Sequence, residues 1–363
     1  MLVSFTTCSV CLVALLPLAG RLGLIDHPGE RRRVHREPVP KIGGLAIFVA
    51  LLVSSLPFAD LPLAQRYGLA GAALLVLVGA WDDRRPLKPR TRLVAQALAA
   101  LLLTLGGGVT LTSLGDLFGH GPVLLGPLAI PFTVFAVVGI INAFNLVDGI
   151  DGLAAGLLLI ALWPLLVLAP SWGPMQILLA TAVAALIPFL LCNLRWLPFA
   201  RCRVFLGDAG SLLLGYLVAW ALIDATRSPA GLQPVTALWL VALPLADTLA
   251  VMGQRLVTGR SPFAADRRHL HHLLLRMFPG QRRVLVMVLA LAGLLAALGL
   301  TGEYLGLAEA VRFAAALGVF GLYLLWRRSL PRLYHWQLGR HQHRQAPRVD
   351  LMGFRPQEDA TPD

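Results

Sequence analysis

The feature of this sequence that most restricts its fold is a succession of apolar segments, each close to the length of a membrane-crossing helix. A bilayer core of about 30 Å is spanned by ~20 mainly apolar residues in a helix. Eleven segments approach that length, near residues 2–20, 42–58, 67–81, 91–106, 128–147, 152–169, 175–192, 204–223, 234–252, 284–302 and 307–326. Only 14% of the residues are charged, against about 25% in a soluble domain. We therefore expect an all-α, polytopic membrane protein with about eleven transmembrane helices.

The positions of the basic residues predict how the chain crosses the membrane. In an eleven-span arrangement, 28 of the 31 Lys and Arg residues lie in alternate loops and in the C-terminal tail. Basic loops stay on the cytoplasmic side, so the N-terminus is expected outside and the C-terminus in the cytoplasm. The net charge of +12 then reflects contact with anionic membrane lipid, and nucleic acid is excluded as a partner.

This topology divides the chain into a membrane domain, residues 1–326, and a basic cytoplasmic tail, residues 327–363. The first apolar segment has no Lys or Arg before Arg21, so it is expected to remain as a span and not to be cleaved as a signal peptide. The chemistry is expected at the cytoplasmic face, because a set of acidic and histidine residues falls at predicted cytoplasmic helix ends or loops: Asp82, Asp83, Asp148, Asp151, Asp208, Asp266, His269, His271 and His272. These loops lie near 21–41, 82–92, 147–152, 193–208 and 253–283.

An acidic pair, Asp82 and Asp83, ends the third apolar segment and is followed by five basic residues within ten positions. Such a pair can simply be a solvated helix end. Carboxylates beside a cluster of cations are also typical of a phosphoryl-transfer site, where the cations hold phosphate.

Asn142, Asn145 and Asp148 recur at a spacing of three, so they share one face if the helix continues through them. Glycines then surround Asp151 and predict a very short turn. A carboxylate at membrane depth costs about 2.5–3.5 kcal/mol unless it faces a wet or charged cavity. Simple turn formation explains the glycines but neither the two Asp nor the two Asn residues.

Asp208 lies in the segment FLGDAGS, at the start of another apolar run. An intramembrane carboxylate is most easily kept ionised by a cation. The oxygen ligands available here favour Mg²⁺, with Mn²⁺ as an alternative, over zinc.

The loop 253–283 carries Arg255 and the run HLHH, which contains His269, His271 and His272. Imidazole and guanidinium groups suit a diphosphate. A zinc site is less favoured because no cysteine or fourth ligand lies nearby. The sequence contains neither the GxxxxGK[ST] pattern of a P-loop nor a GxGxxG after a strand.

Five ordered motifs resemble the polyprenyl-phosphate N-acetylhexosamine-1-phosphate transferases, within glycosyltransferase family 4. They are DHPGERRRVHREPVPKIGGLAIF, WDDRRPL with RLVAQ, NAFNLVDGIDGLAAG, VFLGDAGSLLLGY and SPFAADRRHLHHLL, and they lie between residues 26 and 274. The resemblance implies a bacterial inner-membrane enzyme that makes undecaprenyl-diphosphate-N-acetylglucosamine and UMP from UDP-N-acetylglucosamine and undecaprenyl phosphate. This would be the first membrane step of O-antigen or related cell-envelope polysaccharide synthesis.

The resemblance also implies roles for individual residues. Asp208 and Asn145 would bind Mg²⁺, and Asp82 and Asp83 would be catalytic at the acceptor phosphate. Asp151 would contact uracil. The donor would further be held by Asp148, Arg255, His269, His271 and His272, and the acceptor phosphate by Arg90 and Arg92.

Arg92 departs from the family, which usually has Lys there. Several alternatives stay open: another UDP-N-acetylhexosamine, a muramoyl-pentapeptide donor (disfavoured by HLHH), an aspartyl-phosphate intermediate, and a homodimer. A secondary transporter would be the alternative of a different class, and it predicts polar residues near the bilayer midplane.

Overall fold

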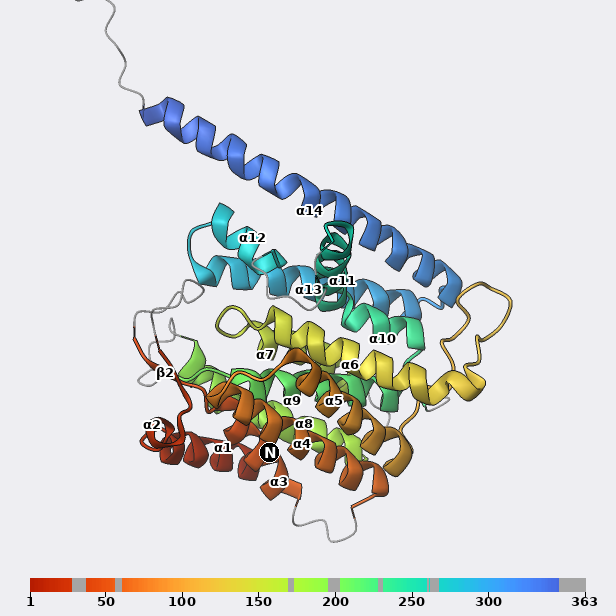
Figure 1. The fold of residues 1–363 in the computed structure, drawn as a ribbon. Coiled ribbons are helices and arrows are strands. Elements are labelled where there is room, and N and C mark those ends of the chain that lie inside the picture. The colour runs from red at the N-terminus through yellow and green to blue at the C-terminus, as the bar shows by residue number, and fades with distance from the viewer. Residues whose placement is uncertain are drawn as a thin grey trace, which may run out of the picture.

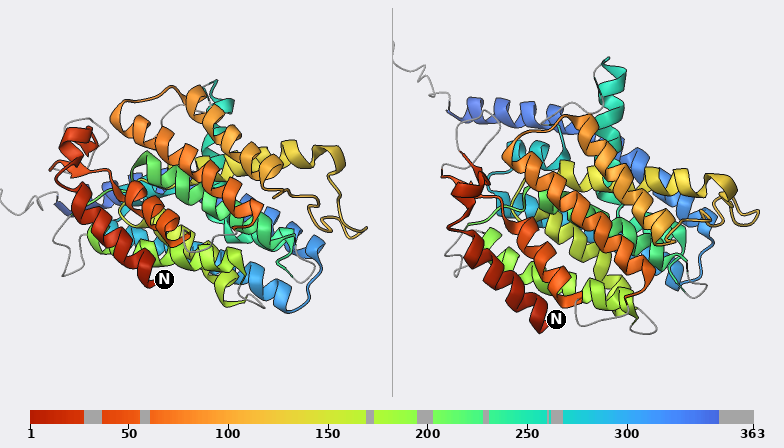
Figure 2. Two further views of the ribbon diagram at one scale, coloured as in Figure 1. Left: turned by 90° about the horizontal axis from the view of Figure 1, so that it is seen from below. Right: turned by 60° about the horizontal axis from the view of Figure 1, so that its bottom comes forward.

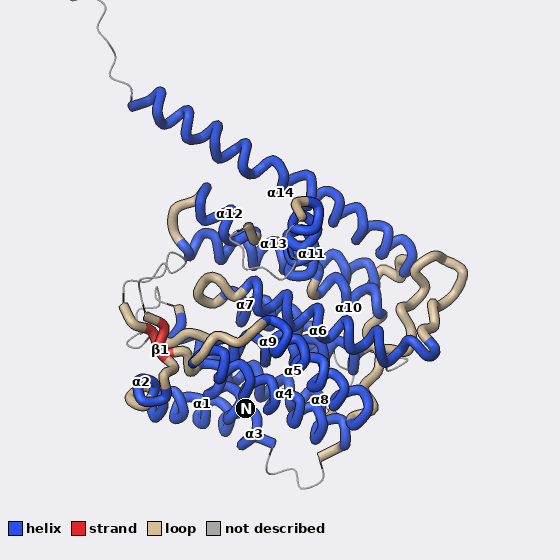
Figure 3. Tube along the Cα trace, viewed as in Figure 1, coloured by secondary structure: helices blue, strands red, loops and turns tan. Residues whose placement is uncertain are grey.

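The computed structural model of the chain describes residues 1–27, 37–55, 61–168, 173–194, 203–227, 231–259, 261 and 268–345, with 331–345 as backbone only. These residues form helices almost throughout (Figure 3). The strands named among them are β1 (Ile25–Asp26) and β2 (Val39–Pro40), which form one antiparallel pair. The prediction of an all-α protein is confirmed.

The apolar segments of the sequence fold as helices because each can satisfy its backbone hydrogen bonds internally, which lipid requires. A π-helical turn, η1 (Leu102–Gly106), extends α5, and a 3₁₀ turn, η2 (Gly126–Leu128), precedes α6. The α-helices are α1 (Leu2–Leu15), α2 (Ala19–Leu22), α3 (Gly43–Ser55), α4 (Leu63–Arg84), α5 (Pro89–Leu101), α6 (Ala129–Val147), α7 (Leu153–Val167), α8 (Pro174–Asn193), α9 (Gly207–Ala225), α10 (Pro234–Leu240), α11 (Ala242–Val257), α12 (Leu270–Met277), α13 (Gln281–Tyr304) and α14 (Glu309–Gln345).

Six helices of the described residues are long and apolar enough to cross a membrane, or seven if α10 and α11 form one bent span. The six are α4, α6 with its preceding turn, α8, α9, α13 and the first part of α14. Helices α1, α3 and α7 are apolar but shorter. The chain is a polytopic membrane protein, as the sequence predicted.

The segment expected as one continuous helix over 234–252 is in fact broken. Helix α10 ends at Leu240, and α11 continues from Ala242 at an angle of 75°. Pro244 explains the break, because it has no N–H to donate to the carbonyl of Leu240. Figure 2 shows the consequence: α11 projects steeply away from the helices around it.

Helix α9 is the most deeply buried candidate span, with 83% of its apolar window inside the protein, and it packs mainly against α4 and α6. Glycines allow α4 and α3 to come close to the N-terminus of α9. A Cβ atom on Gly79 of α4 would lie 2.4 Å from the Cα of Ala209, and one on Gly44 of α3 would lie 2.2 Å from the backbone nitrogen of Gly210. The start of α9 is therefore held between two helix backbones.

The loops at the two ends of the bundle differ in character. In Figure 1, the β1–β2 pair, the α6–α7 turn and α12 lie at one end, and the 107–125 segment projects from the other. The 107–125 segment is a hairpin-like loop, closed by backbone hydrogen bonds between Leu114 and Val123 and between Thr112 and Leu125. Helix α14 runs through position 326 without interruption, so the predicted tail begins as a continuation of this helix.

Candidate active site

The acidic pair lies at the C-terminal end of α4, where both residues are only 7% exposed. Asp82 accepts a hydrogen bond of 2.6 Å from the backbone N–H of Leu87, which closes the turn into α5. Its other carboxylate oxygen, Oδ2, lies 3.1 Å from Nη1 of Arg92. The predicted proximity of Asp82 to this cation is therefore present in the fold, since the α4–α5 turn brings the two residues together.

Asp83 faces the start of α9. Its Oδ2 accepts a hydrogen bond of 3.1 Å from the backbone N–H of Ala209, and its Oδ1 lies 3.3 Å from Nζ of Lys41. Lys41 also donates to the backbone carbonyl of Asp83, at 2.9 Å. We did not predict Lys41 as a site residue, because 42 positions separate it from Asp83 in the sequence.

Asp208 occupies the first turn of α9, directly after Gly207. Gly207 has φ +75°, and a Cβ there would lie 2.5 Å from Oδ2 of Asp83, so only glycine allows the start of α9 to lie this close to Asp83. The side-chain amide of Asn145, from α6, donates to Oδ1 of Asp208 at 2.7 Å and to Oγ of Ser211 at 2.8 Å. The predicted metal ligands Asp208 and Asn145 are thus in direct contact.

This cluster has the donor chemistry of a Mg²⁺ site. Asp83 is buried, Asp208 is half-buried, and the two carboxylates repel one another electrostatically. A divalent cation would relieve that repulsion. In the described part of the chain, no three His, Cys, Asp or Glu side chains converge tightly enough to hold a metal by themselves. Mg²⁺ does not require this, because it usually keeps several waters and takes one or two carboxylates together with substrate phosphates.

The spacing of Asn142, Asn145 and Asp148 predicted a shared helical face, and the structure divides the three. Helix α6 ends at Val147, so Asp148 lies just past it. Asn142 donates to the side-chain oxygen of Gln96 at 2.6 Å, whereas Asn145 contacts Asp208. The shared face therefore holds for Asn142 and Asn145, which lie three residues apart in α6 and line the same cavity. It does not hold for Asp148, because the helix stops one residue earlier than the pattern requires.

Asp148 begins the short turn to α7, where burial and repulsion from Asp208, Asp151 and Asp83 raise its pKa to about 8. The side chain is therefore mostly protonated at pH 7 and can donate a hydrogen bond. Asp151, in the same turn, lies 3.9 Å from Nη2 of Arg203.

The three predicted histidines are grouped at the start of α12 and touch the α6–α7 turn. The ring centroids of His271 and His272 are 4.0 Å apart, and those of His269 and His271 are 6.1 Å apart and stacked. A Cβ on Gly149 would lie 2.1 Å from Nε2 of His271. Burial, and then the neighbouring histidines, lower the pKa of His271 to about 3, so this ring is neutral.

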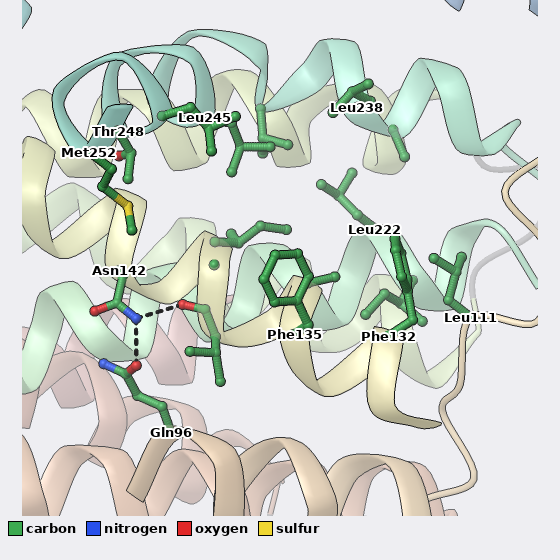
Figure 4. A pocket seen from close by; sticks show the side chains of 18 of the residues that line it. Gln96, Leu111, Phe132, Phe135, Asn142, Leu222, Leu238, Leu245, Thr248 and Met252 are labelled. Carbon is green, nitrogen blue, oxygen red and sulfur yellow. Dashed lines mark hydrogen bonds between the residues drawn. The ribbon is translucent and has the colours of Figure 1, made fainter. Parts of the chain in front are cut away.

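A cavity of about 700 Å³ runs away from the carboxylates between α5, α6, α9 and the α10–α11 pair. Arg92, Asn145 and Arg255 line one part of it, and Phe132 and Leu111 line another. Along α6 the lining extends from Phe132 to Asn145, which is about 20 Å of helix. Apart from a few polar groups such as Gln96 and Asn142, its walls are apolar side chains (Figure 4). We call this cavity the apolar groove.

Arg255 and Arg90 differ in their relation to this site. Arg255 is 2% exposed and lines the apolar groove. Arg90 lies in the first turn of α5 with an exposed side chain, and it does not line the groove as Arg92 does.

One buried carboxylate, Asp247, was not predicted from the sequence as a site residue. Asp247, on α11, is 2% exposed and lies 2.8 Å from Nδ1 of His269. The signal was present, because an acidic residue inside an apolar segment is itself a functional indication. Parts of three predicted loops, 28–36, 195–202 and 262–267, lie outside the described residues.

Comparison with known proteins agrees with this picture. The model of "Glycosyl transferase family 4" matches residues 66–226. Proteins named undecaprenyl-phosphate alpha-N-acetylglucosaminyl 1-phosphate transferase are similar over most of their length. The one from Yersinia pestis is 41% identical over 84% of each chain. The one from Escherichia coli strain K12 is 39% identical over 79% of this chain and 78% of its own, and the one from Haemophilus influenzae is 34% identical over 96% and 98%.

Proposed function

The chain belongs to glycosyl transferase family 4, and from this premise we propose that it transfers N-acetylglucosamine-1-phosphate from UDP-N-acetylglucosamine to undecaprenyl phosphate. The products are undecaprenyl-diphosphate-N-acetylglucosamine and UMP. The relatives with this printed name from Yersinia pestis and Haemophilus influenzae align with 84% and 96% of the chain. The reaction begins a cell-envelope polysaccharide such as O-antigen.

The observation that carries this proposal is the connection between the apolar groove and the carboxylate cluster. A polyprenyl phosphate has a long apolar chain and an anionic head. The groove offers apolar walls along about 20 Å and then a cation, Arg92, paired with Asp82. Arg92 and Lys41 would hold the acceptor phosphate near Asp83 and Asp208.

The acceptor needs little help from a base. The second pKa of a phosphate monoester is near 6, so the acceptor is mostly dianionic at pH 7. We assign Asp82 the role of holding Arg92 in position and accepting any remaining proton. The acceptor phosphate can then attack the β-phosphorus of the donor directly, with UMP as the leaving group. No covalent intermediate on Asp83 is needed, and the oxygens of Asp83 already contact Lys41 and the backbone of Ala209.

The donor would lie on the other side of the cluster. His269, His272 and Arg255 would contact its diphosphate, and the neutral His271 would contribute a hydrogen bond without a charge. Asp151 and Asp148 would bind the uridine part. Bound at Asp208 and Asn145, Mg²⁺, or Mn²⁺ in its place, would neutralise charge on the diphosphate.

We propose eleven crossings, with α1, α3, α7 and the α5–η1 pair added to the seven longer spans. The bundle end that carries α12 and the α6–α7 turn would face the cytoplasm, because the basic segments around Lys41 and Lys88 lie there. The position of the carboxylates also argues against a transporter, since they lie at helix ends and not at mid-helix: Asp82 and Asp83 in the last turn of α4, Asp148 just after α6 and Asp208 in the first turn of α9.

The direct test uses the purified protein in detergent with undecaprenyl phosphate, Mg²⁺ and a panel of UDP-sugars, with UMP release as the measurement. We expect release with UDP-N-acetylglucosamine and none without the lipid. Release with UDP-N-acetylmuramoyl-pentapeptide alone, or with another N-acetylhexosamine alone, would replace the donor in this proposal. Lipid-independent release would exclude the transfer reaction.

A further inference from the structure

Asp247 is the meeting point of three separate parts of the chain. Its Oδ1 accepts hydrogen bonds from the hydroxyl of Tyr323 on α14, at 2.7 Å, and from the backbone N–H of Leu270 at the start of α12, at 3.0 Å. Its Oδ2 lies 2.8 Å from Nδ1 of His269. The Asp247 and His269 side chains are almost completely buried.

These partners fix which nitrogen of His269 carries a proton. The backbone N–H of Leu270 can only donate, and the hydroxyl of Tyr323 donates as well. The Asp247 carboxylate is an acceptor, so it also accepts a hydrogen bond from Nδ1 of His269. Nδ1 of His269 is therefore the protonated nitrogen facing Asp247. The other ring nitrogen, Nε2, is buried and has no hydrogen-bond partner in the described protein.

Helix α14 holds His269 from a second direction. Arg327, one turn beyond Tyr323, donates through Nη2 to the backbone carbonyl of Arg268, the residue before His269. Tyr323 and Arg327 thus secure the carboxylate and the backbone on which the histidine depends. A buried nitrogen without a partner, on a ring held this firmly, indicates a site prepared for a ligand.

We propose that Asp247 is a positioning residue that holds His269 with Nε2 directed at a phosphate oxygen of the nucleotide-sugar diphosphate. This inference rests on the proposed function. A phosphate oxygen is an acceptor, so His269 binds it only when Nε2 also carries a proton. The Asp247 carboxylate supplies the negative charge that balances this second proton, and the resulting hydrogen bond is charge-assisted.

The competing explanation is purely structural, because Asp247 also caps the N-terminus of α12 through Leu270. The Asp247→Asn variant distinguishes the structural role of Asp247 from the positioning of His269. The amide oxygen can still accept from Leu270 and Tyr323, while the amide NH₂ faces Nδ1 and reverses the tautomer of His269. The cap is kept, but the ring loses its counter-charge and offers only a neutral N–H.

The experiment measures kcat and both KM values for the full-length protein as wild type, Asp247→Asn, His269→Ala and the double variant. We expect Asp247→Asn to raise the KM for UDP-N-acetylglucosamine about 5- to 10-fold, the difference between charged and neutral hydrogen bonds, with the KM for undecaprenyl phosphate unchanged. The double variant should match His269→Ala alone, because Asp247 acts through that ring. Asp224→Asn, which alters a carboxylate paired with Arg227 instead, is the control and should match the wild type.

Effects of Asp247→Asn and His269→Ala that multiply in the double variant would overturn the proposal, as would a defect in the KM for undecaprenyl phosphate. Tyr323→Phe gives a milder variant if Asp247→Asn fails to fold, and it should raise only the donor KM. A calorimetric measurement of UDP binding in the presence of Mg²⁺ tests the positioning role of Asp247 separately from the proposed transfer reaction. Weaker UDP binding by Asp247→Asn supports the positioning role even if the wild type fails to transfer sugar phosphate to the lipid, a failure that would overturn only the proposed function.

Discussion

The side-chain amide of Asn145 donates a 2.7 Å hydrogen bond to Asp208 and so joins the last turn of α6 to the first turn of α9. The same amide reaches Ser211 at 2.8 Å. Two segments separated by more than sixty positions are thereby fixed at the point where the carboxylates, the apolar groove and the α6–α7 turn meet.

The charge of Asp208 should be essential. We expect Asp208→Asn to lose nearly all activity, because an amide cannot replace a carboxylate ligand to Mg²⁺, and excess Mg²⁺ should restore little. UMP release over a Mg²⁺ titration measures this. Ser211→Ala is the matched control: it touches the same amide but leaves the carboxylate, so it should stay within a few-fold of the wild type. Full activity of Asp208→Asn at ordinary Mg²⁺ would place the ion on Asp82 and Asp83.

Arg92 should act on the acceptor. Its Nη1 lies 3.1 Å from Asp82 at the end of the apolar groove. Arg92→Lys keeps the charge and should keep much of the activity. Arg92→Ala loses a charge-assisted contact of about 1.5–3 kcal/mol, or roughly 10- to 150-fold. The loss should appear in titrations of undecaprenyl phosphate and leave the KM for the donor unchanged; the reverse pattern would move Arg92 to the nucleotide site.

Gly79 should tolerate no side chain. Its Cβ would lie 2.4 Å from the backbone of Ala209, so Gly79→Ala must push the start of α9 away and displace Asp208. We expect a loss of at least 10-fold in activity together with a lower melting temperature. Gly293→Ala, in α13, meets nothing within 4 Å and should melt at least as high as the wild type, since alanine favours helices. Equal behaviour of the two variants would show that α4 and α9 are not packed this closely.

Asp148 should make stability depend on pH. Its pKa in the folded protein, about 8, lies above the ordinary value of 3.8, so the folded state binds the extra proton. The stabilising effect of that proton is lost as the pH rises toward 8. The lowered pKa of His271 acts in the opposite range, below 6.5. Between pH 6.5 and 8 the melting temperature of the substrate-free, metal-free protein should therefore fall, by at most roughly 3–6 °C per pH unit from this group.

Asp148→Asn cannot titrate, so its melting temperature should change less over the same pH interval. The measurement is fluorescence-detected melting in detergent with a chelator present. Parallel curves for the two proteins would mean that Asp148 is ionised in the folded state.

The proposed orientation can be tested with single cysteines in a background without the native ones. His120→Cys, in the exposed 107–125 loop, should react with an impermeant thiol reagent added to intact cells. Arg283→Cys, exposed at the start of α13, should react only after the membrane is opened. The opposite result would place the carboxylate cluster on the outer side.

Much of this architecture could be predicted because it depends on local pattern. Apolar length located the long helices but not α12, which lies in a predicted loop, and the ordered motifs included the carboxylates around Asp208. The pairing of Lys41 with Asp83 could not be predicted in this way, since hydropathy describes the burial of a residue and not its partner. The sequence shows Asp247 as an acidic residue in an apolar segment but not its partners, which are known only when α11, α12 and α14 are packed together.

The apolar groove shows the second limit of sequence reading. It exists because α10 and α11 diverge at Val241, and the proline that causes the bend lies within an otherwise continuous apolar segment. Length and hydropathy predict one span for that segment, and they contain no information about the bend within it.

The apolar groove has side chains that remain open to the surroundings: Phe135 is 72% exposed and Leu249 is 56% exposed. In a membrane, those surroundings are the acyl chains themselves. Withdrawing a polyprenyl chain from lipid would cost about 0.8 kcal/mol for every CH₂ group, far more than any single binding event returns. A wall shared with the bilayer removes that cost, because the lipid can slide in and out sideways while its tail never leaves a hydrocarbon environment. If the groove holds the acceptor as proposed, the lipid would reach the site by two-dimensional diffusion within the leaflet.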